Sequence, residues 1–327
     1  MLNEFSLISR YFSRHEKSPD AAILGVGDDC ALLAPRPGRV LAISTDMLVE
    51  DRHFFAGADA RALGHKTLAV NLSDLAAMGA AARAFTLALA LPSIDEAWLE
   101  AFSDGLYALA DRSGCELIGG DTTKGPLTLC VTVFGDVEAT RALRRDAAAP
   151  GDDIWISGTL GDARLALGGL REEWPLTPED LATARRAMDW PEPRLALGAA
   201  LAGVAHAALD ISDGLAGDVL HILERSNAGA RIDLDALPRS AILANQPAMI
   251  QRQCTVAGGD DYELCFTAPV TARDAVLAAG ASCRVPVTRV GTITAFDTRA
   301  DEARIVWTDG DGKPVPLALR GFDHFDD

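Results

Sequence analysis

Residues 39–46 read RVLAISTD, an apolar strand that runs directly into an acidic residue. The same scheme, in which an apolar segment or a glycine turn leads into aspartate, recurs along the chain. The carboxylates placed in this way are Asp28, Asp29, Asp46, Asp121, Asp210, Asp213, Asp260 and Asp261. A strand end fixes a carboxylate in space, and glycine lets the backbone approach a ligand closely. A single aspartate of this kind can be a turn former or a helix cap, but the repetition favours a shared cation.

Strands and helices alternate irregularly around these carboxylates, which favours an α+β protein of two domains over a regular βαβ series. The patterns predict helices over residues 4–12, 60–78, 94–113, 162–170, 178–188, 193–202, 215–226 and 272–279. They predict strands over residues 21–27, 39–45, 85–91, 115–120, 127–137, 153–158, 205–212, 230–237, 287–294 and 303–309, and a glycine turn leading into a strand over 255–269. The polar segment 140–153 contains the turn signal Pro150-Gly151. We therefore place the boundary between Val137 and Gly151 and the domains at residues 1–138 and 150–327.

The composition narrows the class of protein. A chain of 327 residues, 49% of them hydrophobic, is long enough for two buried cores. A formal charge of -17 argues against nucleic acid and against anionic membranes as partners. The sequence contains no uncharged apolar stretch long enough to span a bilayer and no signal-peptide core, so we expect a cytoplasmic protein. The six cysteines occur singly without a CxxC pair, which favours buried reduced thiols over a zinc site.

Asp74 stands apart because NLSD lies inside a helical pattern, on the side that should be buried. A buried carboxylate needs a cation or a hydrogen-bonding partner. Aspartate, serine and threonine oxygens without convergent histidine or cysteine suit Mg²⁺ or Ca²⁺, and no DxDxDG calcium loop is present. Mg²⁺ binds through a few carboxylates together with substrate phosphates, so the carboxylates indicate phosphoryl chemistry. The chain lacks a P-loop and the HRD and DFG kinase motifs, which leaves metals and glycine-turn amides to bind phosphate.

A series of motifs then identifies a family. In order they are GVGDDCALL, STDMLVEDRHF, KTLAVNLSDLAAMGA, GGDTTKGPL, LDISDGL, GGDDYELCF and GFDHF. Together they resemble the thiamine-monophosphate kinase family, within the superfamily of aminoimidazole ribonucleotide synthetase and selenophosphate synthetase. The resemblance implies a two-domain aminoimidazole-ribonucleotide-synthetase-like fold, with an N-terminal sheet domain that forms a homodimer and a C-terminal α/β domain. It also implies transfer of the γ-phosphoryl group of ATP to thiamine monophosphate, giving thiamine diphosphate and ADP.

The resemblance assigns site residues by position. It implies that several Mg²⁺ ions are held by Asp28, Ser44, Thr45, Asp46, Asp74, Asp121, Asp210 and Asp213. It implies ATP contacts from Asp28, Gly120, Asp121, Arg145 and Ser212, and thiamine phosphate contacts from His53, Glu263 and Phe322. The nucleophile is a phosphate oxygen that is already ionised at neutral pH, so no general base is expected.

The residues alone leave alternatives open for several of these positions. Arg145 can be a phosphate fork or a solvated linker arginine. Glu263 and Phe322 suit a cationic aromatic substrate, or they are a surface carboxylate and a core aromatic. His53 would be an ordinary surface histidine without the neighbouring STD motif. Asp260 also stands where the family commonly has glutamate.

Two rival functions remain. One is another ATP-dependent enzyme of the same superfamily. Selenophosphate synthetase would need a reactive cysteine or selenocysteine in a glycine-rich N-terminal segment, whereas the N-terminus here is not glycine-rich and Cys30 is interpreted as part of an apolar strand that continues past the strand predicted over 21–27. Aminoimidazole ribonucleotide synthetase is disfavoured only by the detailed motifs. The other rival is a non-catalytic acidic cation-binding protein, which would explain the carboxylates but not the paired glycine turns or Arg145.

Overall fold

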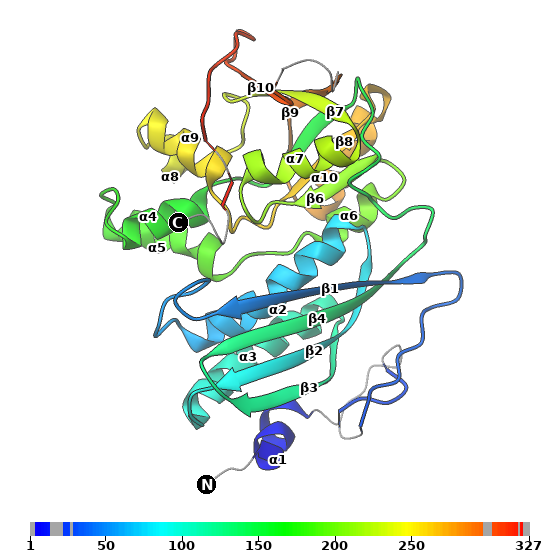
Figure 1. Cartoon of the computed structure of the whole chain (residues 1–327), viewed down its shortest axis with the longest axis vertical. Helices are drawn as coiled ribbons and strands as arrows, with labels where there is room; N and C mark the ends of the chain where they lie inside the picture. The colour runs from blue at the N-terminus through cyan, green and yellow to red at the C-terminus, as the bar shows by residue number, and fades with distance from the viewer. Residues whose placement is uncertain (1–3, 14–21, 27–28, 297–302, 320, 323–327) are drawn as a thin grey trace. The chain divides into compact units, whose positions relative to one another are not determined.

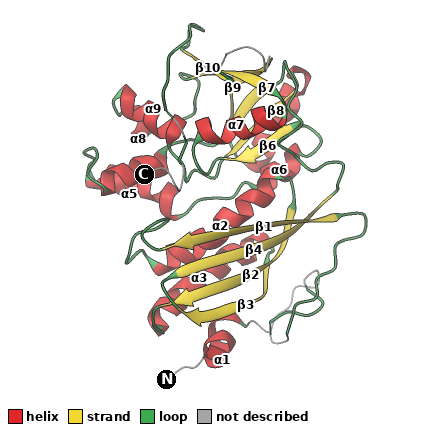
Figure 2. Ribbon diagram, viewed as in Figure 1, coloured by secondary structure: helices red, strands yellow, loops and turns green. Residues whose placement is uncertain are grey.

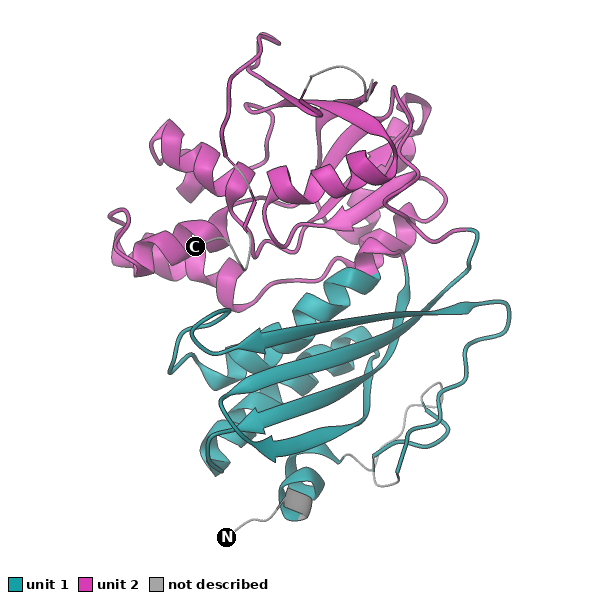
Figure 3. Ribbon diagram, in the orientation of Figure 1, with its two compact units in different colours: residues 1–75, 80–140 teal, residues 76–79, 141–327 magenta. Residues whose placement is uncertain are grey.

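The computed structural model describes residues 4–13, 22–26, 29–296, 303–319 and 321–322, and the chain divides into two compact units (Figure 1, Figure 3). Unit 1 comprises Met1–Leu75 and Ala80–Thr140, and unit 2 comprises Ala76–Gly79 and Arg141–Asp327. None of the helices in the described part of the chain has the length and apolar character that a membrane span requires.

Unit 1 is built on a four-stranded sheet with the strand order β1-β4-β2-β3. Its strands are β1 (Val40–Val49), β2 (Ala81–Leu91), β3 (Glu116–Lys124) and β4 (Thr128–Val137). β4 pairs antiparallel with both of its neighbours, and β3 runs parallel to β2 at the far edge. The helices α2 (Ala60–Ala77) and α3 (Glu96–Ser113) cover one face of the sheet (Figure 2). A short helix α1 (Glu4–Leu7) continues into the π-helical turn η1 (Ile8–Phe12).

The ends of α3 illustrate how local sequence sets the helix bounds. Asp95 accepts the amides of Ala97 and Trp98 at the N-cap, and Gly114 closes the helix in the left-handed conformation at φ 63. An aspartate N-cap is a standard signal for a helix start, and a glycine in the left-handed conformation is a standard signal for a helix end.

Unit 2 is built on a six-stranded sheet with the order β10-β7-β9-β5-β8-β6, in which only the β10–β7 pair is parallel. The strands are β5 (Asp153–Ser157), β6 (Ala207–Asp210), β7 (Ala228–Asp233), β8 (Leu264–Ala268), β9 (Val287–Ala295) and β10 (Ile305–Thr308). The helices are α4 (Asp162–Leu170), α5 (Pro178–Asp189), α6 (Leu195–Leu201), α7 (Leu215–Arg225), α8 (Ala241–Ala244), α9 (Ala248–Ala257) and α10 (Arg273–Cys283), with the 3₁₀ turn η2 (Val270–Ala272).

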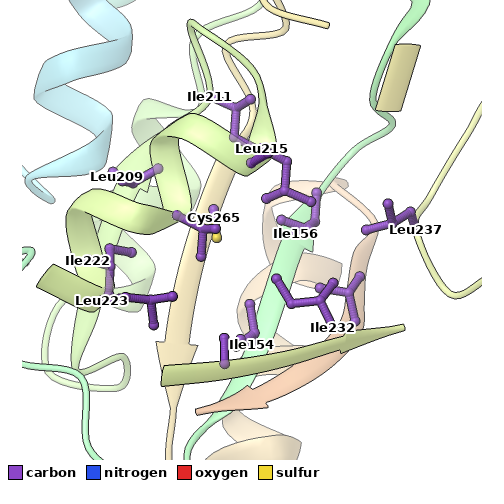
Figure 4. Close-up of a cluster of buried hydrophobic side chains, with 14 of the residues drawn as sticks. Ile154, Ile156, Leu209, Ile211, Leu215, Ile222, Leu223, Ile232, Leu237 and Cys265 are labelled. Carbon is purple, nitrogen blue, oxygen red and sulfur yellow. The ribbon is translucent and has the colours of Figure 1, made fainter. Parts of the chain in front are cut away.

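The core of unit 2 lies between α7 and the centre of the sheet (Figure 4). Leu215 and Ile222 of α7 pack in the same buried cluster as Ile154, Ile156 and Cys265, and all five side chains are fully buried. Burying a leucine or isoleucine side chain stabilises a fold by roughly 1.5–3 kcal/mol. This packing anchors the loop between β6 and α7, which carries the DISDG motif.

The structure confirms the α+β architecture and most of the predicted elements, but one predicted strand is wrong and the helices α8 and α9 were not predicted. The predicted strand over residues 21–27 is wrong, because its described part forms only isolated bridges such as the one between Leu24 and Leu32. Cys30 accordingly lies exposed in a bend and not in a strand. Residues 248–257 form the helix α9, which the sequence analysis missed.

Candidate active site

The first group of candidate residues lies where β1 meets α2 in unit 1. The Ser44 hydroxyl donates a hydrogen bond of 2.5 Å to Asp74 Oδ2. The amide of Asp46 donates to Asn71 Oδ1 at 3.0 Å, and Asn71 Nδ2 donates to the Thr67 carbonyl at 3.1 Å. The partner predicted for Asp74 is therefore present, and two hydrogen bonds hold β1 against α2 at the predicted metal ligands.

Thr45 points to the other face of the same strand. Its hydroxyl lies 2.9 Å from the hydroxyl of Thr132 on β4. Because side chains alternate along a strand, Thr45 shares this face with Ile43 and Met47. These two apolar side chains are 60% and 54% exposed.

Gly120 and Asp121 lie on β3, at the opposite edge of the sheet from β1. Asp46 pairs with Val131, Val131 with Leu87, and Leu87 with Gly120. This row crosses three strand spacings, or about 14 Å of sheet. One protomer therefore does not bring Asp121 next to Asp46.

The second group lies in unit 2, where three separate segments meet at the DISDG turn. The amide of Asp260 donates to the Ser212 carbonyl, the amide of Tyr262 to the Ile211 carbonyl, and the amide of Phe322 to the Asp213 carbonyl, each at 2.8 Å. Asp260 and Tyr262 both have positive φ, at 69 and 52, which is uncommon for residues other than glycine. The GGDDYE segment is thus held in a strained turn against the DISDG turn.

Asp218, in the first turn of α7, accepts hydrogen bonds from the same loop. It is 5% exposed, and its Oδ2 accepts the amides of Ser212 and Asp213, both at 3.1 Å. Burial, with the charges of Asp213 and Asp210 adding to it, raises the pKa of Asp218 to about 7. The turn therefore gathers three carboxylates in one small region.

Glu263 is neither a surface carboxylate nor exposed to bulk solvent. It is 6% exposed, and Arg194 Nε donates to its Oε2 at 2.7 Å while Arg194 Nη2 donates to its Oε1. Ser157 Oγ donates to Oε2 at 2.5 Å. Gly158, at φ 55, leaves room for this carboxylate, because a Cβ there would lie 2.0 Å from Glu263 Oε1. The Glu263 charge is thus balanced within the protein.

The remaining predicted residues have less defined surroundings. Phe322 is 52% exposed and is therefore not a core aromatic. His53 is half-buried, and its Nδ1 accepts the amide of Val49 at 3.0 Å. Arg145 is exposed, and its carbonyl accepts a hydrogen bond of 2.9 Å from Ser226. Asp28 lies outside the described residues.

A further pair of acids, Asp162 and Asp261, is half-buried, and Asp261 belongs to the GGDDYE segment. Asp261 Oδ1 accepts the amide of Gly161 at 2.9 Å, while its Oδ2 is buried without a hydrogen-bond partner. Burial raises the pKa of Asp261 well above its usual range. Burial likewise raises the pKa of Asp162, which accepts a hydrogen bond of 2.6 Å from Ser240.

The donor chemistry of the predicted ligands fits Mg²⁺. Ser44, Asp46 and Asp74 in unit 1 and Asp210 and Asp213 in unit 2 are all oxygen donors, which Mg²⁺ prefers. No three His, Cys, Asp or Glu side chains within the described ranges gather closely enough to hold a metal ion by themselves. Mg²⁺ characteristically keeps waters and binds through one or two carboxylates plus phosphate oxygens, so a complete protein cage is not required.

Sequence reasoning missed several residues of these groups. They are Asn71, Ser157, Arg194 and Asp218. Asn71 lies inside the motif KTLAVNLSDLAAMGA, and Asp218 follows the motif LDISDGL by three residues. Their polar side chains close to these motifs are the signal that could have identified them. Arg194 lies between α5 and α6, in a stretch that the sequence analysis predicted only as the beginning of a helix over residues 193–202.

Comparison with known proteins places these residues in a family. Residues 27–137 match the AIR synthase related protein N-terminal domain, and residues 149–300 match the corresponding C-terminal domain. The chain is 46% identical over 325 residues to thiamine-monophosphate kinase of Escherichia coli strain K12, covering 98% of both chains.

Solved structures agree with this. The crystal structure of thiamine-monophosphate kinase from Stenotrophomonas maltophilia K279a is 46% identical, has a TM-score of 0.83, and covers 91% of this chain and 93% of that one. AaThiL complexed with AMPPCP and TMP is 28% identical with a TM-score of 0.76, covering 89% of each chain. The likeness extends over nearly the whole length of the chain in both sequence and fold, and the chain belongs to the thiamine-monophosphate kinase family.

Proposed function

We propose that this chain transfers the γ-phosphoryl group of ATP to thiamine monophosphate, giving thiamine diphosphate and ADP. The observation that carries the proposal is the 46% identity to the Escherichia coli kinase over 98% of both chains. A second support is the similarity to AaThiL, which was solved with AMPPCP and TMP. The oxygen donors at the predicted ligand positions suit the chemistry of such a transfer.

Mg²⁺ is the metal that the unit 1 residues would hold. Ser44 and Asp46 in the middle of β1 and Asp74 on α2 supply a hydroxyl and two carboxylates, with Asn71 fixing the Asp46 backbone. Mg²⁺ bound to ATP neutralises phosphate charge, which is the main requirement when two polyanions react. Without it, carboxylates and phosphates would repel one another.

The unit 2 residues would contact the nucleotide and its metal through Asp210, Ser212 and Asp213. Their turn is held by hydrogen bonds to the Asp218 carboxylate and from the backbone amides of Asp260 and Phe322. Arg145 is exposed, and its planar guanidinium is well suited to bind a phosphate group. No general base is needed, because the attacking phosphate oxygen is already ionised.

Phe322 and His53 would bind the acceptor. The ring of Phe322 is half exposed next to the Asp213 backbone, where an aromatic ring can stack on it. Direct contact of Glu263 with the acceptor stays a prediction. Its pairing with Arg194 means that a cationic substrate would have to compete with that ion pair.

We also propose a homodimer, formed through the outer face of the unit 1 sheet. Leu41, Ile43 and Met47 leave this face of β1 apolar, at 38%, 60% and 54% exposure. Ile43→Lys should shift the protein toward monomer in light scattering. Met249→Lys, at a 75% exposed position of unit 2, is the matched control.

The proposed activity is tested by ADP release from purified protein with ATP and Mg²⁺. Thiamine monophosphate is compared with thiamine and with formylglycinamidine ribonucleotide as acceptor. Turnover that depends on thiamine monophosphate supports the proposal, and turnover on the purine precursor alone would replace the substrate. Asp46→Asn and Asp121→Asn should abolish turnover, whereas Asp104→Asn, on an exposed position of α3, should leave it unchanged.

A further inference from the structure

Asp218 carries a carboxylate for which the proposed reaction has no role so far. It lies in the first turn of α7, whose N-cap residue Gly214 offers no side chain to cap the helix. Asp218 instead reaches back beyond the helix start, where its Oδ2 accepts the amides of Ser212 and Asp213. These two amides would otherwise need water or a ligand as acceptor.

The backbone amides and carbonyls of Ser212 and Asp213 all form hydrogen bonds within the protein. Both amides donate to Asp218, the Ser212 carbonyl accepts the amide of Asp260, and the Asp213 carbonyl accepts the amide of Phe322. Among the partners in these four hydrogen bonds, Asp218 is the only side chain. A substitution at Asp218 therefore changes the support of the turn without altering a residue proposed to touch the nucleotide.

The Ser212–Asp213 turn is closely packed, so a small change in the hydrogen bonds that hold it would displace neighbouring backbone. A Cβ on Gly214 would lie 2.9 Å from the Ala257 carbonyl carbon, and one on Gly259 would lie 2.2 Å from the Ser212 carbonyl oxygen. Asp218 itself is 5% exposed and lies at the edge of the buried α7 core. A longer acid at this position cannot accept the same two amides without moving the turn.

We propose that Asp218 is a positioning residue of the phosphoryl-transfer site, which holds the Ser212–Asp213 turn in one arrangement before the nucleotide binds. The inference rests on the proposed function of Asp210, Ser212 and Asp213. Groups held in place in advance lower the cost of reorganisation during the reaction, and a misplacement of 1 Å can lower a rate about 10²-fold.

Three variants of the full chain separate geometry from charge. Asp218→Asn keeps an oxygen that can accept both amides but removes the charge. Asp218→Glu keeps the charge but changes the reach, and Asp218→Ala removes both. Asp152→Ala is the control, because Asp152 is also buried, at 3% exposure, and accepts the amide of Ala149 at 2.9 Å in a turn outside the proposed site.

Two readouts are used for each variant: kcat and KM with MgATP and thiamine monophosphate, and hydrogen exchange of the amides of residues 210–214. Asp218→Ala should lower kcat about 10²-fold and speed exchange at Ser212 and Asp213. Asp218→Asn should keep the protection and stay within about fivefold of wild type, and Asp218→Glu should lose at least about tenfold in kcat. Asp152→Ala should keep kcat whatever its stability.

The inference is overturned if Asp218→Ala retains kcat within about twofold, or if its Ser212 and Asp213 amides exchange as slowly as in wild type. It is also overturned if Asp218→Asn falls as far as Asp218→Ala, since charge and not geometry would then be decisive. If Asp218→Ala does not fold, full activity in Asp218→Glu would have the same meaning. Absence of turnover in wild type would instead refute the proposed function, while hydrogen exchange would still test the support of the turn.

Discussion

Replacing Arg194 with methionine should destabilise unit 2, because the change removes the cation that balances a buried carboxylate. Arg194 donates two hydrogen bonds to Glu263, which is 6% exposed and has Ser157 as its other side-chain donor. Burial acts to lower the pKa of Arg194, but the hydrogen bond and charge of Glu263 outweigh it, so the pKa is raised. The ion pair between Arg194 and Glu263 therefore contributes to the free energy of unfolding.

The size of the effect follows from what is left behind. Removing one partner of a buried ion pair costs roughly 3–5 kcal/mol, because the other charge stays buried without compensation. The side chain of Arg194 is 24% exposed, which places Arg194→Met at the lower end, about 3 kcal/mol. The double variant Arg194→Met/Glu263→Gln removes the remaining charge and should recover about 2 kcal/mol of that loss.

Urea unfolding followed by tryptophan fluorescence measures these changes, since Trp155 and Trp174 are buried in unit 2. A loss of about 3 kcal/mol corresponds to a fall in Tm of roughly 6–12 °C for a unit of 150–250 residues. Arg144→Met is the control, because its pair with Asp146 is exposed and should not affect stability measurably. If Arg194→Met changes the unfolding free energy by less than about 1 kcal/mol, or if the double variant is no more stable than the single one, the ion-pair argument is wrong.

Three further predictions concern other parts of the molecule. Burial raises the pKa of the Cys254 and Cys265 thiols to about 12, so both should resist alkylation at about pH 8 until the protein unfolds. The exposed Cys30 should react first, and equal labelling of the three cysteines by mass spectrometry would contradict this. Burial raises the folded-state pKa of Asp261 well above its usual range, so its contribution to stability is present at low pH and is lost as the pH rises. Wild type should therefore lose stability relative to Asp261→Asn as the pH rises above about 4, and parallel pH profiles would refute the assignment. Gly120→Ala should destabilise unit 1 by at least about 3 kcal/mol, because φ is 149 and a Cβ would lie 1.9 Å from the Leu87 carbonyl oxygen. Gly114→Ala, with φ 63 and open space around it, should cost only about 1–2 kcal/mol, and similar losses in both variants would argue against the clash.

Elements with strong local signals were predicted closely from the sequence. The helix predicted over residues 162–170 is α4, and the helix predicted over 60–78 ends one residue earlier, at Ala77. The strand predicted over 21–27 failed because an apolar run does not specify a partner strand, and the described part of this segment forms only isolated bridges. The helix α9 was missed because its C-terminal end, TVA, runs into the GGDD turn and was read together with it. The domain bounds at 1–138 and 150–327 stay a prediction.

Sequence motifs predicted candidate site residues at glycine turns and strand ends, but Asp46 and Asp121 lie inside β1 and β3, because both strands continue past the predicted ends. The motifs also did not indicate which residues meet. The contact between Ser44 and Asp74 depends on β1 crossing α2, and the contact of Asp260 with Ser212 joins two loops far apart in the chain. The separation of Asp46 from Asp121 follows from the strand order, which no local pattern encodes. Arg194 and Asp218 act through tertiary contacts, so their roles became visible only in the folded chain.

The most direct test of the proposed reaction follows the transferred phosphorus atom. Purified protein is incubated with Mg²⁺, thiamine monophosphate and ATP labelled with ³²P at the γ position, and the products are separated. Direct transfer predicts label in the terminal phosphate of thiamine diphosphate, formed in equal amount to ADP. Release of the label as inorganic phosphate, with thiamine monophosphate unchanged, would contradict the proposed kinase reaction.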